Sequence, residues 1–167
     1  GLGYLALTKL TTGTKNTGLG RTALENTTTA SDNTSVGYAS LSQNTTGGSN
    51  TALGSLALNL NTTGANNVAI GKDALKANTT ADNNTAVGKD ALLANTTGTR
   101  LAAFGTFTLD SNTTANDNTG FGYGALATTT TGAENTAVGS QALISTTTGV
   151  GNTALGFNAL LDNTTGA

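Results

Sequence analysis

The sequence predicts an all-β solenoid, a rod in which the chain coils repeatedly and each turn stacks on the one before. Three observations lead to this prediction. A seventeen-residue unit repeats along the whole chain without insertion or deletion, glycine always fills its fifth position, and leucine always fills its ninth. A repeat this short and regular is typical of a solenoid or a fibre, because one unit cannot bury its apolar side chains alone.

The unit is N-T-A-Φ-G-x-x-A-L-x-x-N-T-T-G-x-x, where Φ is a large apolar residue. Successive copies begin at Asn16, Asn33, Asn50, Asn67, Asn84, Leu101, Asn118, Asn135 and Asn152, after a truncated unit that starts with Gly1 at its third position. We therefore interpret residues 1–167 as a single repeat domain, a section of a longer fibre. At a strand spacing of about 4.8 Å, roughly ten coils would give a rod about 45–50 Å long.

Positions one to four predict a short β-strand that the glycine ends. Because alternate strand side chains point to opposite faces, we expect the fourth residue to point into the coil and the third to point outward. The third residue is always small, which would let a neighbouring chain approach closely. The alanines of this expected contact face are Ala52, Ala69, Ala86, Ala137 and Ala154.

The constant positions suggest structural roles. The glycine indicates a positive φ or a backbone approached too closely for a Cβ, and the leucine indicates a core slot of fixed volume. The Asn-Thr-Thr-Gly stretch is typical of a turn, and stacked first-position asparagines are expected to form amide ladders between coils. In two adjoining units the constant glycine, leucine and threonine residues are Gly54, Leu58, Thr62, Thr63, Gly71 and Leu75.

The Asn-Thr-Thr triplets also match the pattern for N-glycosylation. Turn formation accounts for them without a glycan, and we prefer that interpretation. The asparagines concerned are Asn44, Asn61, Asn78, Asn95, Asn112 and Asn163, with Asn26 one place earlier in its unit.

Composition argues against several classes of function. The net charge is −2 and only 10% of residues are charged, whereas nucleic-acid binding requires a basic stripe. No apolar run approaches the roughly 20 residues that cross a bilayer. The chain has no His and no Cys, so common catalytic bases, nucleophiles and soft metal ligands are missing. We therefore expect no enzyme, no cofactor and no metal site.

The sixth and seventh positions of the unit vary most. Asp73 and Asp90 follow Lys72 and Lys89 in adjacent units, which predicts a solvated, charge-balanced surface. Exposed aromatic rings can stack on sugars, so the sixth positions form a candidate recognition stripe, although these residues are equally well explained as filler or as contacts between chains. The stripe consists of Tyr4, Tyr38, Lys72, Lys89, Tyr123 and Phe157.

The units at Asn50–Gly54 and Asn152–Gly156 resemble repeats of bacteriophage tail-fibre proteins and of large bacterial surface-fibre adhesins. The Asn-Thr-Ala-Val-Gly version at Asn84 and Asn135 is similar to the head repeat of trimeric autotransporter adhesins, whose unit is shorter, so that match is partial. The resemblance implies a parallel homotrimer of β-solenoids. It also implies an extended stalk or adhesive shaft that is extracellular, on a cell surface or on a virion.

The leading hypothesis is therefore a structural shaft or adhesive segment of a fibre that mediates attachment to a surface, with a cell-surface glycan as one candidate receptor. An ice-binding solenoid is the first alternative, because regular threonine ranks on a flat face can order water. Neighbouring threonines in a strand point to opposite faces, so only one rank would face ice. The second alternative is a polysaccharide-degrading spike or its non-catalytic stalk. An enzyme of that kind would need a carboxylate pair in a groove between chains.

Overall fold

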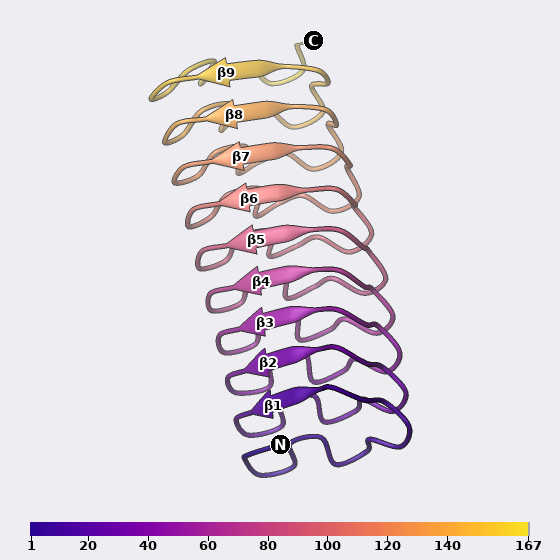
Figure 1. Ribbon diagram of the computed structural model, residues 1–167. Coiled ribbons are helices and arrows are strands. Elements are labelled where there is room, and N and C mark those ends of the chain that lie inside the picture. Colours follow the sequence, from indigo (N-terminus) through magenta and orange to yellow (C-terminus); the bar gives the residue numbers. More distant parts are fainter. Residues whose placement is uncertain (167) are drawn as a thin grey trace.

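The computed structural model describes residues 1–166, which form one β-solenoid with a short strand in each successive coil (Figure 1). Nine strands pair in sequence order as a single parallel sheet, and no described residue is helical. The strands are β1 (Thr17–Leu19), β2 (Thr34–Val36), β3 (Thr51–Leu53), β4 (Val68–Ile70), β5 (Thr85–Val87), β6 (Ala102–Phe104), β7 (Thr119–Phe121), β8 (Thr136–Val138) and β9 (Thr153–Leu155). The predicted all-β solenoid with a seventeen-residue repeat is confirmed.

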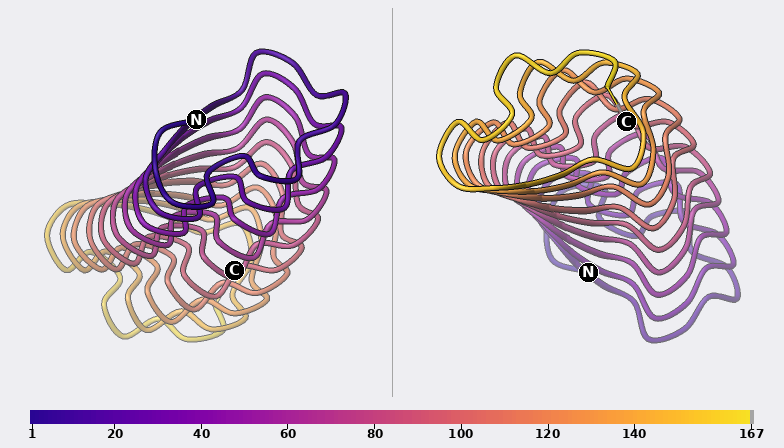
Figure 2. Two further views of the ribbon diagram at one scale, coloured as in Figure 1. Left: turned by 90° about the horizontal axis from the view of Figure 1, so that it is seen from below. Right: turned by 90° about the horizontal axis from the view of Figure 1, so that it is seen from above.

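Each repeat position stacks on its own equivalent in the next coil. Ala52 of β3 pairs with Ala69 of β4, for example, and this register holds from β1 to β9. Backbone hydrogen bonds also join neighbouring coils outside the strands: Leu58 N donates to Ala74 O at 3.0 Å. Viewed along the rod, the coils overlay with a gradual rotation from one end to the other (Figure 2). Hydrogen bonding around the coil satisfies backbone groups that short strands alone would leave open.

The two faces of the strand are the reverse of our expectation. Third-position side chains lie inside the coil, where Ala69 and Ala86 are fully buried. Fourth-position side chains point outward, and Leu53 is 46% exposed. The assignment of the small residues to an outer contact face is therefore wrong. The buried residues concerned are Ala52, Ala69, Ala86, Ala137 and Ala154.

The third residue is small because the opposite wall of the solenoid, formed by the preceding unit, lies close to it. A Cβ added to Gly18 would lie only 3.2 Å from Leu7 Cγ. A second site shows the same constraint. Thr108 replaces the usual alanine at the eighth position, and the third-position residue facing it is Gly120, whose added Cβ would lie 2.6 Å from Thr108 Cγ2. A larger side chain at the eighth position is therefore matched by a smaller residue at the third position that faces it, as close packing requires.

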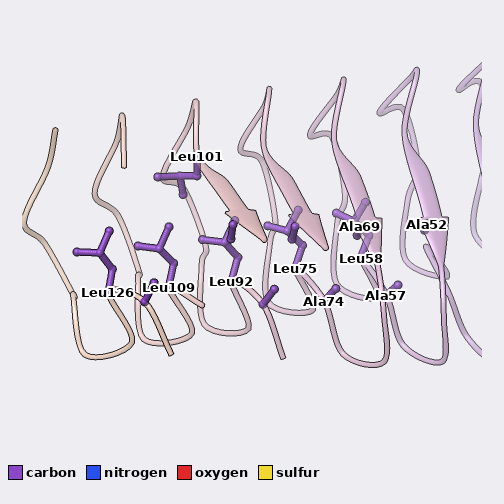
Figure 3. Close-up of a cluster of buried hydrophobic side chains, with 14 of the residues drawn as sticks. Ala52, Ala57, Leu58, Ala69, Ala74, Leu75, Leu92, Leu101, Leu109 and Leu126 are labelled. Atoms are coloured by element: carbon purple, nitrogen blue, oxygen red, sulfur yellow. The ribbon is translucent and has the colours of Figure 1, made fainter. Parts of the chain in front are cut away.

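Ninth-position leucines form the apolar centre of the rod. Leu58 and Leu75 are fully buried, as predicted, and the row continues from coil to coil alongside the inner alanines (Figure 3). These leucines adopt φ values of 51° and 49°, in the left-handed region. That conformation costs about 1–2 kcal/mol for a residue with a Cβ. Burial of a leucine side chain contributes a comparable or larger amount, which explains why the unusual backbone is retained.

Two asparagine ladders fill the remaining interior. In the first, Asn67 N donates to Asn50 Oδ1 at 3.0 Å, and Asn50 Nδ2 donates to Gly64 O at 2.9 Å. In the second, Asn61 Nδ2 donates to Asn44 Oδ1 and to Gly64 O, both at 2.9 Å. The predicted first-position ladder is confirmed, and the twelfth position adds a parallel one. Five twelfth-position asparagines are fully buried and so inaccessible to glycosylation in the folded chain: Asn44, Asn61, Asn78, Asn95 and Asn112.

The two threonines of the turn have different environments. Thr62 Oγ1 donates to Thr79 O of the next coil at 3.0 Å, and the backbone N–H of Thr62 donates to the same oxygen. Thr63 is exposed, and only its backbone contacts that oxygen. The side chain of the first threonine therefore hydrogen-bonds to the next coil, whereas the side chain of the second is exposed to solvent.

Replacing Thr27 by asparagine should stabilise the rod. Thr27 occupies the twelfth position, and its buried Oγ1 has no hydrogen-bond partner. An asparagine would accept from Asn44 Nδ2 and donate to Ala30 O, as its equivalents do in later coils. We expect a gain of about 1 kcal/mol, which corresponds to a melting temperature about 2–4 °C higher. Thr29→Asn, at an exposed position of the same coil, is the control and should change the melting temperature little.

Candidate functional site

The predicted recognition stripe lies along one edge of the sheet. Its members all occupy the first turn residue after the strand glycine, where the chain loops back beyond the arrowheads in Figure 1. The exposed fractions are 68% for Tyr4, 51% for Tyr38, 53% for Tyr123 and 74% for Phe157. Lys72 and Lys89 are exposed as well. The structure thus places all six at equivalent, solvent-facing positions, and their role in recognition remains a prediction.

The turn that carries the stripe has a defined backbone. Gly71 opens it with a φ of 131°, and the seventh-position residue Asp73 follows with a φ of 58°. Asp73 N donates to Ser55 O in the preceding coil, and Asp90 N donates to Lys72 O, both at 3.0 Å. Because each turn is bonded to the one before it, sixth-position side chains are held one coil apart.

Two lysines of the stripe are paired with carboxylates. Asp73 lies 3.4 Å from Lys72 and 3.0 Å from Lys76, and Lys89 lies 2.6 Å from Asp90. We expected a solvated carboxylate here. The Asp73 side chain is only 10% exposed, so this carboxylate is largely covered. Burial alone would raise the pKa of Asp73, but hydrogen bonds and charge from Lys76 and Lys72 outweigh it, and the pKa is lowered.

Aromatic side chains of the edge contact cations. The Arg21 guanidinium carbon lies 5.9 Å from the ring centre of Tyr4 and 5.8 Å from that of Tyr38, one coil away on either side. Our sequence-based stripe left Arg21 out, although its sixth position between two tyrosines was visible.

A second aromatic cluster lies further along the same edge. Lys89 Nζ lies 4.7 Å from the ring centre of Phe107, and this ring meets Tyr123 edge-on at 5.9 Å. Here the cation also has a carboxylate partner, Asp90. The two clusters therefore differ: the charge of Lys89 is neutralised by Asp90, whereas Arg21 has no carboxylate partner among the described residues.

A continuous apolar surface runs along the outer face of the sheet, and sequence reasoning placed it inside. We call it the outer apolar rank, formed by the fourth-position residues Leu2, Leu19, Val36, Leu53, Ile70, Val87, Phe104, Phe121, Val138 and Leu155. Phe104 and Phe121 stack with ring centres 4.5 Å apart and planes 6° from parallel. The sequence did contain one indication of this exposure: the fourth position carries Leu, Val, Ile or Phe in different coils, and an exposed surface accepts such variation more readily than a core does.

Ion pairs link coils at the seventeenth position. Arg100 Nε and Nη2 donate to the two oxygens of Asp117 at 2.6 and 2.8 Å, and Lys15 lies 3.7 Å from Asp32. The hydrogen bond from Arg100 lowers the pKa of Asp117. These pairs are exposed, so we assign them a minor contribution to stability.

Searches for a metal site, a pocket and a membrane span concern residues 1–166 only. Within residues 1–166 no three His, Cys, Asp or Glu side chains lie together as a metal site, and no pocket is present. Burial raises the pKa of Asp110, and the charge of Asp90 adds to the rise. The same residues include no helix long and apolar enough to span a membrane.

Comparisons of the chain with protein-family models, with curated proteins and with solved structures found no match. The resemblance to fibre repeats therefore rests on the repeat motif alone.

Proposed function

We propose that this chain is a structural shaft or adhesive segment of a fibre outside the cell or on a virion, built from parallel copies of itself. The proposal rests on one observation, the outer apolar rank. Within the stack, away from both ends, Leu53 is 46% exposed, Phe121 42% and Val138 37%. Soluble monomers rarely expose a contiguous apolar surface that runs the length of the molecule, so this surface is best explained by a partner that covers it.

The partner that fits this surface best is another copy of the chain. One apolar side chain projects from each coil, and the coils follow at strand spacing, about 4.8 Å. A partner that stays in register across nine strands must repeat its own apolar groups at the same interval. A parallel copy does so by construction, and its twist follows the same path.

Three copies are favoured over two by the resemblance to trimeric fibres. Cyclic symmetry about the rod axis would bring three outer ranks together at the centre, closing the assembly and leaving the turn edges outside. In this arrangement the sixth-position stripe remains available for attachment to a surface. The proposed contact face is thus formed by the fourth-position residues, and not by the small third-position residues as expected from sequence.

The proposal predicts that polar substitution of the outer rank weakens assembly without unfolding the coil. We expect Ile70→Thr combined with Val87→Thr to raise the dissociation constant at least about tenfold, because it removes buried apolar groups while keeping β-branched side chains. Native mass spectrometry and light scattering at micromolar concentration measure the oligomeric state. Circular dichroism checks that the fold is retained.

Leu60→Thr is the control for this test. Leu60 is an exposed apolar residue at the eleventh position, outside the strands and so outside the outer apolar rank. Its replacement should leave the oligomeric state unchanged. A wild-type chain that is a cooperatively folded monomer at micromolar concentration would refute the shaft proposal.

An ice-binding solenoid is the second candidate, supported by the exposed threonine of each turn. Residues such as Thr63, Thr80 and Thr97 are exposed at equivalent positions of successive coils. The preceding threonines are half-buried, and the hydroxyls of Thr62 and Thr79 bond to the next coil, so a single rank faces solvent. Thermal hysteresis of the purified chain would favour this function over the shaft, and its absence would remove this candidate.

A further inference from the structure

We propose that Tyr4, Arg21 and Tyr38 form a binding site for a carboxylated sugar unit of an acidic polysaccharide. The inference deepens the attachment role proposed above by naming a ligand class. It concerns the turn edge of a single chain and so does not require any particular oligomeric state.

Arg21 is the first element of the site because its hydrogen-bonding groups are unused. Among the described residues, no carboxylate lies within ion-pair distance of its guanidinium, and its side chain makes no hydrogen bond. Arg100, the other arginine, is saturated by Asp117 and by Thr99 Oγ1. A guanidinium presents a planar fork that matches a carboxylate with two parallel hydrogen bonds. Arg21 is therefore the free carboxylate-binding group of this edge.

The flanking tyrosines fix this guanidinium and add stacking surfaces. Both rings lie within 6 Å of the Arg21 guanidinium carbon, a distance at which cation–π attraction holds the side chain in place. Both rings are also more than half exposed. The next sixth-position residue after Tyr38 is the small Ser55, so no bulky neighbour of that row covers the far side of the ring. A pyranose ring can stack there while its carboxylate reaches Arg21.

The charge of the site favours a carboxylated sugar over nucleic acid. The chain as a whole carries a net charge of −2, and the lysines further along the stripe are neutralised by Asp73 and Asp90. Nucleic-acid binding draws its affinity from many cations that contact successive phosphates. A single free guanidinium between two aromatic rings instead matches one carboxylate and the apolar face of a sugar.

The test is binding of the whole chain to polygalacturonate, with dextran as the neutral polymer and an oligothymidylate as the nucleic acid. Affinity electrophoresis gives the dissociation constants. We expect retardation by polygalacturonate alone, and an affinity at least about tenfold lower for Arg21→Gln, because a charge-assisted pair is lost. Arg21→Lys should also bind more weakly, since an ammonium lacks the planar fork. Tyr38→Ser should lose affinity with little change in melting temperature.

Arg100→Gln controls for general effects of charge. It removes one positive charge outside the stripe and should bind polygalacturonate as the wild type does. Equal binding by Arg21→Gln and wild type, or stronger binding of oligothymidylate that depends on Arg21, would overturn the proposal. Light scattering on the same samples reports assembly separately. If no polygalacturonate binding is found while the chain still assembles, the sugar site is refuted and the shaft proposal is retained. If a monomeric chain binds polygalacturonate, the sugar site is retained and the shaft proposal is refuted.

Discussion

Replacing Leu58 by aspartate should be among the most destabilising single changes in this chain. Leu58 is fully buried in the apolar row between Leu41 and Leu75. The substitution removes most of a leucine side chain from the core and places a carboxylate where no cation or hydrogen-bond donor meets it. Loss of packing alone costs about 2–5 kcal/mol, and the buried charge adds to it. We expect a total of about 5 kcal/mol or more.

Leu60→Asp is the matched control for this change, because it makes the same substitution two residues later in the same coil. Leu60 is 44% exposed, so its replacement should cost about 0.5 kcal/mol or less. Chemical denaturation followed by circular dichroism compares the two variants. Hydrogen exchange should show protection lost first around β3 and β4, because each coil contacts only its neighbours. Similar losses for Leu58→Asp and Leu60→Asp would contradict the assignment of these two positions to core and surface.

The repeat made the architecture predictable. Once the period is known, equivalent residues must stack, and the roles of Leu58, Gly54 and the first-position asparagines follow from what a stack requires. Leucine fills a slot of constant volume, glycine accommodates a close backbone, and asparagine bonds to its own copy in the next coil. These are demands within one coil or between two adjacent coils, so a single sequence contains them.

The direction of the strand faces was not predictable by the same reasoning. Alternation shows that Ala52 and Leu53 point to opposite sides, but it does not say which side is the inside. The usual rule, that the larger apolar residue is buried, fails because the coil is too narrow for two large side chains on facing walls. Leu58 already fills that space, so the strand can contribute only an alanine, a serine or a glycine.

Backbone conformation was the other missing element. Leu58 at a φ of 51° is rare for a residue with a Cβ, and no propensity scale favours leucine there. The tight turn requires it, because the chain must reverse within a few residues and still direct the side chain inward. The outer apolar rank was not predicted either, because its position depends on which face of the strand points outward. The exposure of the candidate stripe was better predicted, because its members occupy the sixth position, just beyond the strand, where neither orientation of the strand would bury them.

The fifth-position glycine gives the second large effect, because the rod depends on it for the spacing of its coils. Gly71 has a φ of 131°, a conformation that residues with a Cβ rarely adopt. A Cβ at this site would lie 2.5 Å from Gly88 O and 2.6 Å from Gly88 C. These atoms belong to the backbone of the next coil, so they cannot move aside without breaking the hydrogen bonds that join the two coils.

Gly71→Ala should therefore destabilise the chain by about 3 kcal/mol or more, since backbone strain and the clash with the next coil add together. Gly151→Ala is the control. Gly151 also has a positive φ, 73°, but an added Cβ meets no atom within 4 Å, and other coils carry residues such as Asp117 and Glu134 at this position. It should cost about 1 kcal/mol or less. Denaturation midpoints of the two variants test the difference. A Gly71→Ala chain as stable as Gly151→Ala would mean that the coils can separate at this edge, and that close approach of glycine backbones does not set the spacing of the stack.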